Sequence, residues 1–167
     1  MRASKFIFCR GGYTLAEVVV VLSITVIFLG FTLALPGANK QKLDVAASTV
    51  AEDIRLVQQL NMNQDAVYTV LFDCQNDIYY IQRGLSLYKK VQLPYGVDLV
   101  LTNFDFDNYS DNGCDHKLRF NIRGEPVRNN GILCGGHLSL RDKNGNFRYV
   151  IVASVTGRVR TDKVPPA

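Results

Sequence analysis

An unbroken apolar segment near the N-terminus constrains the fold of this chain more than any other feature. Residues 18–35 form a run of eighteen without a charged side chain. As a helix this run would reach roughly 27 Å, which is close to the hydrocarbon thickness of a bilayer. Its residues are apolar on every face, as a lipid-exposed helix requires. Pro36 and Gly37 end the pattern, so we expect a transmembrane helix over residues 13–36.

Basic residues before this run predict its orientation. Arg2, Lys5 and Arg10 precede it with no acid among them, so the positive-inside rule keeps the N-terminus cytoplasmic. The remainder would then lie on the outer, periplasmic face of the cytoplasmic (inner) membrane. A secretory signal peptide is the alternative, but residues 32–34 offer only a weak cleavage site. Glu17 also argues against it, because a carboxylate at membrane depth costs about 2.5–3.5 kcal/mol and usually has a partner.

The residues at this boundary carry a resemblance to a known family. The sequence Gly12-Tyr13-Thr14-Leu15-Ala16-Glu17, placed directly before the apolar run, resembles the signal of type IV prepilins and pseudopilins. In that family a prepilin peptidase cleaves after the glycine and methylates the new N-terminus. The resemblance implies a leader peptide of residues 1–12, cleavage after Gly12 and methylation of Tyr13, where the family more often has Phe.

The same resemblance implies a role for Glu17 in filament assembly. After cleavage, Tyr13 would carry a cationic amine close to the Glu17 carboxylate. When subunits stack, Glu17 of one subunit can neutralise the amine of its neighbour, and an unpaired charge in an apolar bundle is costly. We therefore expect other pilins or pseudopilins, the prepilin peptidase and the membrane as partners.

The remaining residues, 37–167, predict an α+β globular head. Between residues 40 and 62 the apolar side chains recur at spacings of three and four, which predicts an amphipathic helix; they are Leu43, Ala46, Ala47, Val50, Ile54, Val57 and Leu60. Such a stripe needs a sheet to cover it. Segments rich in β-formers follow, at residues 66–72, 78–82, 88–93, 97–102, 118–122, 132–140, 147–154 and 155–160. We expect a pilin-like fold: a long N-terminal helix packed on an antiparallel β-sheet.

A second resemblance concerns the C-terminal half. Leu118-Arg119-Phe120 with Gly124, the helical Ile54-Arg55-Leu56 and the terminal Gly157-Arg158-Val159-Arg160 are similar to those of GspH-like minor pseudopilins and FimT-like minor pilins. This resemblance implies a structural subunit of a type II secretion pseudopilus or a type IV pilus. Its head would contact other minor pseudopilins and secreted cargo.

The terminal Gly-Arg-Val-Arg motif supports an alternative function. On a strand, Arg158 and Arg160 would point to the same face. With Arg148 nearby they could bind successive phosphates through charge-assisted hydrogen bonds. FimT-like proteins use this motif in DNA capture for natural transformation, which makes a DNA-binding minor pilin the second hypothesis. The favoured interpretation is a solvated strand end that touches a neighbouring pseudopilin.

The cysteines leave their pairing open. Cys9 would be lost with the leader, and the three that remain, Cys74, Cys114 and Cys134, cannot all pair within one chain. Because the cell exterior permits disulfides, we expect Cys114 to pair with Cys134. A fully reduced set is the alternative.

Two polar clusters contain side chains of the kinds that bind metal ions. Cys114-Asp115-His116 and the segment from Cys134 to His137 could supply thiolates and imidazoles to zinc, but their spacing matches no standard finger. Asp105, Asp107 and Asp111 share a polar loop in which calcium ligands could gather, although the EF-hand pattern fails. A plain acidic loop is the favoured interpretation, and we expect no metal and no cofactor.

Catalysis has no support in the sequence. The chain contains no G-x-S-x-G, H-E-x-x-H or P-loop motif, and its two histidines leave little for histidine-based chemistry. We therefore expect a structural subunit rather than an enzyme.

Overall fold

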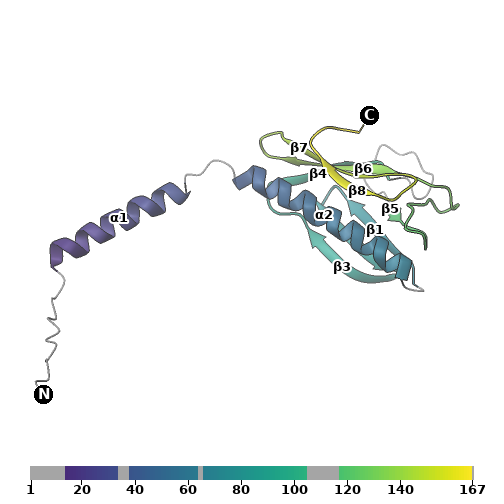
Figure 1. Ribbon diagram of the computed structural model, residues 1–167, viewed down its shortest axis with the longest axis horizontal. Coiled ribbons are helices and arrows are strands. Elements are labelled where there is room, and N and C mark those ends of the chain that lie inside the picture. Colours follow the sequence, from purple (N-terminus) through teal and green to yellow (C-terminus); the bar gives the residue numbers. More distant parts are fainter. Residues whose placement is uncertain (1–13, 34–37, 64–65, 105–116, 167) are drawn as a thin grey trace, which may run out of the picture. The chain divides into compact units, whose positions relative to one another are not determined.

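The computed structural model describes residues 14–33, 38–63, 66–104 and 117–166. The chain divides into two compact units, residues 1–36 and residues 37–167. The first contains helix α1 (Leu15–Leu33), and the second contains helix α2 (Ala38–Asn63) and the described strands (Figure 1).

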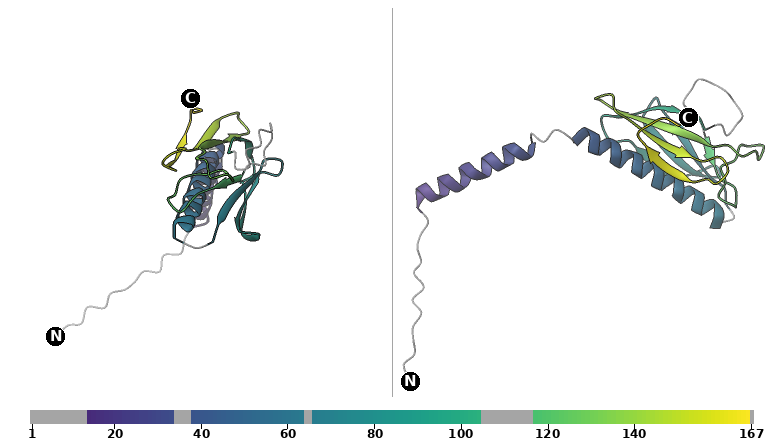
Figure 2. Two further views of the ribbon diagram at one scale, coloured as in Figure 1. Left: turned by 90° about the vertical axis from the view of Figure 1, so that its right-hand side faces the viewer. Right: turned by 45° about the horizontal axis from the view of Figure 1, so that its top comes forward.

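Helix α2 lies close to its predicted bounds and buries the predicted stripe. Its buried apolar side chains are Leu43, Ala46, Ala47, Val50, Ala51, Ile54 and Val57, and Leu60 packs against them in a partly buried position. The stripe faces strands of both sheets, because α2 contacts β1 in one sheet and β4, β6, β7 and β8 in the other (Figure 2). The prediction of an amphipathic helix packed on antiparallel strands is therefore confirmed.

The strands form two sheets, where we predicted one. The first has the order β3-β2-β1-β5, and the second has the order β4-β6-β7-β8. Every neighbouring pair is antiparallel. The bounds are β1 (Tyr68–Asp73), β2 (Ile78–Arg83), β3 (Ser86–Gln92), β4 (Val97–Thr102), β5 (Lys117–Arg119), β6 (Gly136–Asp142), β7 (Phe147–Val152) and β8 (Val159–Asp162).

The division into two sheets arises at the turn between β3 and β4. There Gly96 adopts a φ of 89°, a positive value that glycine adopts far more easily than other residues. The chain leaves β3 at the edge of the first sheet, and β4 pairs instead with β6, with Val97 opposite Asp142. Strand order depends on such distant pairing, which the local pattern of β-formers does not contain.

Two predicted strands begin four residues later than expected. Strand β6 begins at Gly136 rather than at residue 132, because the preceding residues pair with the loop after β5: Leu133 forms an isolated bridge with Val127, and the Cys134 nitrogen donates to the Pro126 carbonyl at 2.9 Å. Strand β8 begins at Val159 rather than at residue 155, after a turn in which Gly157 has a φ of 63°. The predicted Asn-Gly hairpin is present between β6 and β7, with Gly145 at a φ of 81°.

The hydrophobic core belongs entirely to the second unit. Its buried members extend from Leu43 to Val159. Aromatic rings fill its centre, where the ring centroids of Phe72 and Phe104 lie 5.5 Å apart and nearly parallel. Since residues 37–167 contain this core, we expect them to fold without the N-terminal unit.

Candidate functional site

Helix α1 begins with a capped first turn that contains Glu17. Thr14 precedes the helix, and its hydroxyl oxygen accepts a hydrogen bond of 3.2 Å from the backbone nitrogen of Glu17. A threonine followed three residues later by glutamate is the capping-box pattern of a helix start. A carboxylate in the first turn also interacts favourably with the helix dipole. Glu17 is exposed, and among the described residues no side-chain hydrogen bond to its carboxylate is found.

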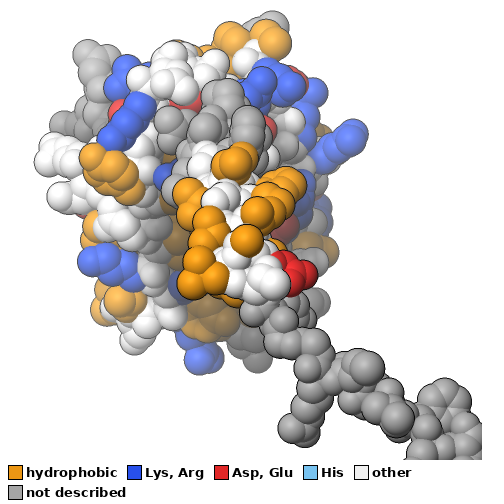
Figure 3. Space-filling model, turned by 90° about the vertical axis from the view of Figure 1, so that its left-hand side faces the viewer, with side chains coloured by type: hydrophobic (Ala, Val, Ile, Leu, Met, Phe, Trp, Pro, Cys, Tyr) orange, Lys and Arg blue, Asp and Glu red, His pale blue; other side chains and the backbone are white. Residues whose placement is uncertain are grey.

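The rest of α1 is apolar and exposed on all sides. Each described side chain from Leu15 to Gly30 is exposed, and Figure 3 shows hydrophobic side chains covering this helix. Ser23 and Thr25 donate their hydroxyl protons to the carbonyls of Val19 and Val21, at 2.8 and 2.7 Å. Their polar groups are thus satisfied inside the helix.

Of the described helices, none is both long enough and apolar enough to count as a membrane span. The predicted cleavage and methylation residues, Gly12 and Tyr13, lie outside the described residues. Asp105, Asp107 and Asp111, the candidate calcium ligands, also lie outside them.

Gly157, the glycine of the Gly-Arg-Val-Arg motif, packs closely at the junction of α2, β8 and the loop after β5. A Cβ at Gly157 would clash with the carbonyl oxygen of Gly124 and would come within 2.6 Å of Gln58 Nε2. That amide nitrogen donates to the carbonyls of Gly124 and Gly157, at 2.6 and 3.2 Å. Helix α2 therefore holds both glycine turns through one side chain.

The valine of the motif is also structural. Val159 is buried, and its carbonyl accepts a hydrogen bond of 3.0 Å from Arg55 Nη2 on α2. Arg158 and Arg160, in contrast, are exposed on either side of it. The motif thus separates into a buried part, which ties the edge strand to α2, and two arginine side chains that reach solvent.

Arg160 shares its sheet face with a row of aromatic rings. It lies opposite Ile151, and Tyr149 and Phe147 follow on that face because side chains alternate along a strand. The rings of Phe147 and Tyr149 are stacked, with centroids 6.2 Å apart. His137 contacts Tyr149, and burial lowers the pKa of this histidine. His137 is therefore neutral at neutral pH, and the positive charge on this face comes from arginine.

The predicted contribution of Arg148 to an anion site is wrong. Arg148 is only 7% exposed. Its Nε donates to the Asp44 carboxylate on α2, and its Nη1 donates to the carbonyl of Phe147 at 2.8 Å. The side chain lies on the inner face of β7 together with Val150, so it joins β7 to α2 and does not accompany Arg158 and Arg160.

A buried polar cluster centred on Asp53 of α2 was not predicted from the sequence. Asp53 is 7% exposed and accepts hydrogen bonds from two strands: Tyr79 Oη at 2.6 Å, and Lys89 Nζ at 2.6 and 2.8 Å. Burial and the Asp53 carboxylate raise the pKa of Tyr79 well above its ordinary value. We call these three residues the Asp53 cluster. They join α2 to β2 and β3.

The structure also corrects the predicted cysteine pairing. Cys74 is disulfide-bonded, whereas Cys134 is a buried thiol, so the predicted bond between Cys114 and Cys134 is not formed. Cys114 itself lies outside the described residues. Within the described part of the chain, no group of three or more His, Cys, Asp or Glu side chains is placed to hold a metal ion.

The comparisons with known proteins concern the fold. No protein-family model matches this chain, and no curated protein matches it significantly in sequence. Two solved structures of the minor pseudopilin EpsH from the type II secretion system of Vibrio cholerae are similar to it. One is 12% identical with a TM-score of 0.52 and covers 73% of this chain and 97% of its own. The other is 13% identical with a TM-score of 0.56 and covers 77% and 98%. The predicted pseudopilin-like fold is confirmed by this likeness.

Proposed function

We propose that this chain is a minor pseudopilin or minor pilin, a structural subunit of a type II secretion pseudopilus or a type IV pilus. The observation that carries the proposal is the likeness of its fold to that of a minor pseudopilin. The capped, apolar helix α1, with Glu17 in its first turn, supports the same function.

In this proposal the chain enters the cytoplasmic membrane through the uncharged run of residues 18–35. Its N-terminus is cytoplasmic and its head lies on the outer face. A prepilin peptidase removes residues 1–12 and methylates Tyr13. Helix α1 then packs among the helices of other subunits, where the Glu17 carboxylate neutralises a neighbouring amine. The chain has no enzymatic task in this proposal.

Two measurements on protein from the host test the proposal. Mass spectrometry of the mature protein should find N-methylated Tyr13 as the first residue. Glu17→Gln should reduce incorporation into sheared filaments, because it removes the charge and keeps the shape. Glu52→Gln is the matched control, since Glu52 is exposed on α2. An intact leader, or equal incorporation of the two variants, would contradict the proposal.

A DNA-binding minor pilin is the second candidate. It is favoured by the two exposed arginines of the motif, because Arg160 shares a face with the stacked rings of Phe147 and Tyr149. Basic side chains beside aromatic rings suit single-stranded nucleic acid, whose phosphates and bases they contact respectively.

A gel shift on residues 37–167 separates the two candidates. If DNA binds, replacing both Arg158 and Arg160 with alanine should weaken binding and should lower the slope of log affinity against log salt by about 1.4–1.8. The control replaces Arg83 and Arg123, which are exposed and belong to the first sheet and the loop after β5. Absence of binding at low salt, or equal losses in both variants, removes this candidate.

A further inference from the structure

Strand β3 is an edge strand whose outer side is open. It ends the first sheet, in the order β3-β2-β1-β5, and lies at the border of the head (Figure 1). Among the described residues, the backbone of β3 is hydrogen-bonded only to β2. An open edge carries a row of unpaired N–H and C=O groups, which can pair with a strand of another chain.

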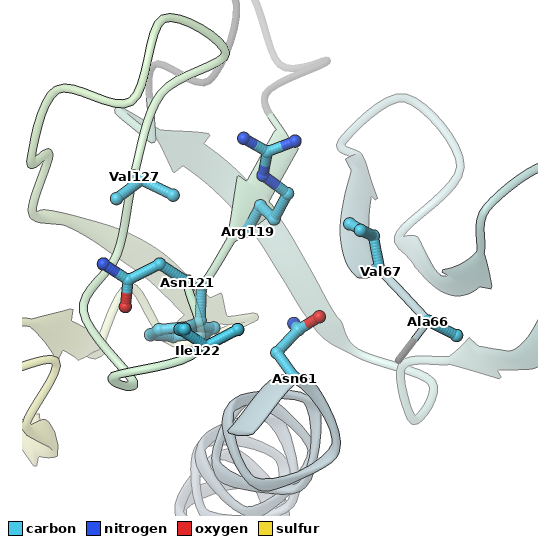
Figure 4. A pocket seen from close by; sticks show the side chains of 8 residues that line it. Asn61, Ala66, Val67, Arg119, Asn121, Ile122 and Val127 are labelled. Atoms are coloured by element: carbon cyan, nitrogen blue, oxygen red, sulfur yellow. The ribbon is translucent and has the colours of Figure 1, made fainter. Parts of the chain in front are cut away.

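The other edge of this sheet is closed by the chain itself. The loop after β5 returns alongside that strand, and the Val127 nitrogen donates to the Arg119 carbonyl at 2.9 Å. Figure 4 looks into the pocket beside β5 and shows Arg119 and Val127 on neighbouring segments. A partner strand would have to displace this loop in order to pair with β5.

Both edges of the second sheet are also engaged. On β4, the Leu99 nitrogen donates to Asp77 Oδ1 at 2.8 Å. On β8, the Val159 carbonyl accepts from Arg55 Nη2 at 3.0 Å. Within the described part of the chain, β3 is therefore the edge strand that nothing caps, although its seven residues make it the longest of the four.

The register of the ladder shows which groups of β3 face outwards. The Leu93 nitrogen donates to the Asp77 carbonyl at 2.9 Å, one residue beyond the last pair of β3 and β2. In an antiparallel ladder this bond makes that last pair a non-hydrogen-bonded one, and hydrogen-bonded pairs alternate with such pairs. The N–H and C=O groups of Lys90 and Gln92 therefore point away from β2, whereas those of Val91, between them, bond to it.

The features that usually protect an open edge do not close this one. Lysines and bulges discourage the addition of a strand. Here Lys89 Nζ belongs to the Asp53 cluster, and Lys90 Nζ lies over an aromatic ring of β2, 5.7 Å from its centroid, so both lysines are directed towards their own domain. The bulge at Tyr88 precedes residues 89–92, which keep an unbroken register with β2.

Charge and apolar exposure favour a different chain over a second copy as the occupant. Residues 78–97 contain the cations Arg83, Lys89 and Lys90 and no acid. Pairing β3 with itself would bring the cations of two copies side by side, and like charges destabilise a strand pair. Leu87 is 60% exposed and Tyr88 is 51% exposed, so a strand with apolar side chains would bury apolar surface beside the edge.

We propose that β3 binds an extended segment of a partner protein, which adds to the first sheet as a further strand. Lys90 and Gln92 provide the backbone hydrogen bonds, and Leu87 and Tyr88 provide apolar contacts. Strand addition takes its affinity from main-chain hydrogen bonds, so the partner segment must be free of proline. The proposal concerns the head alone and does not depend on filament assembly.

Amide hydrogen exchange of isotope-labelled residues 37–167 tests it. The probe is the capped peptide Glu-Thr-Val-Thr-Val-Glu, and the control is the same peptide N-methylated at its central residues, which keeps the side chains but cannot pair. At half saturation the probe should slow exchange at Lys90 and Gln92 about twofold, since bound amides are protected. The Val91 amide should exchange slowly with or without the probe. Absence of slowing at millimolar probe, or equal slowing by the methylated peptide, overturns the proposal.

Two variants at one position locate the binding. Lys90→Pro removes an outward N–H and spares the ladder with β2, because proline is tolerated where an edge N–H faces solvent. It should weaken the probe about fivefold, as expected for the loss of one hydrogen bond. Lys90→Ala is the matched control, since it removes the same side chain and keeps the N–H, and slow exchange at Val91 checks that β3 remains paired in both. Equal affinity of the two variants contradicts the proposal. Protection of Lys90 and Gln92 that grows with protein concentration alone would assign the edge to a second copy and would also overturn it.

Discussion

Removing the Asp53 carboxylate should destabilise the head, because it removes the acceptor of the hydrogen bonds that join α2 to β2 and β3. In Asp53→Ala, the buried Tyr79 hydroxyl loses its acceptor, and an unsatisfied buried polar group costs about 1–3 kcal/mol. Lys89 loses its partner too, but its side chain is 42% exposed and water can replace the carboxylate. That part contributes at most about 1 kcal/mol. The expected loss in unfolding free energy is therefore about 1–4 kcal/mol.

Urea unfolding of residues 37–167 measures this loss. Glu52→Ala is the control, because it removes an exposed acid next to Asp53 and should change the free energy by less than about 0.5 kcal/mol. A double-mutant cycle with Tyr79→Phe isolates the hydrogen bond. In the Tyr79→Phe background the Asp53→Ala loss should be smaller, since no hydroxyl is left unsatisfied. An Asp53→Ala loss equal to that of Glu52→Ala would refute the reasoning.

The same cluster predicts a pH dependence. Burial and Asp53 raise the pKa of Tyr79, so the folded state keeps this proton when the unfolded state loses it near pH 10. The Tyr79 contribution to stability is complete below pH 10 and is lost as the pH rises above it, at about 1.4 kcal/mol per pH unit. Stability curves of the wild type and of Tyr79→Phe, measured from pH 8 to 11, should diverge by this slope. Parallel curves would contradict it.

Three further changes test the junctions of α2 and the hairpin. Gly157→Ala should cost about 2–4 kcal/mol, since it combines backbone strain with a steric clash, whereas Gly145→Ala, with open space around its Cβ position, should cost about 1 kcal/mol in the same unfolding assay. Asp44→Ala should cost about 1–3 kcal/mol because Arg148 is buried and loses its carboxylate; Lys42→Ala, at an exposed site, is its control. Hydrogen bonds from Asn146 lower the pKa of Asp142. The Asp142 carboxylate should therefore stabilise the wild type relative to Asp142→Asn above about pH 4, and this advantage should be lost as the pH falls through the lowered pKa of Asp142.

The features that the sequence predicted well depend on near neighbours along the chain. The stripe of α2 was predictable because residues three and four apart share a helix face. The hairpin at Gly145 was predictable because a two-residue signal specifies its turn. Arg148 could have been placed correctly by the same reasoning, since alternation in β7 puts it on one face with Val150 and Val152, which are buried.

The features that were missed depend on residues far apart in sequence. Asp53 accepts hydrogen bonds from residues 26 and 36 positions away, and no local pattern distinguishes it from the exposed Glu52. The second sheet depends on the pairing of β4 with β6, across a segment that includes β5. Strand order follows from the total packing of the core rather than from the propensity of any one strand.

The Gly-Arg-Val-Arg motif shows why a short pattern does not decide between the two candidate functions. The backbone carbonyls of Gly157 and Val159 bind Gln58 and Arg55, and so hold the edge strand against α2. A chain with this junction therefore needs this glycine and this valine for its fold, independently of what its head binds. Arg158 and Arg160 have no part in that junction, since both side chains reach solvent. Evidence for DNA binding must therefore come from substitutions of the two arginines that leave the unfolding free energy unchanged. A loss of DNA binding on substitution of Gly157 would report only the loss of the junction.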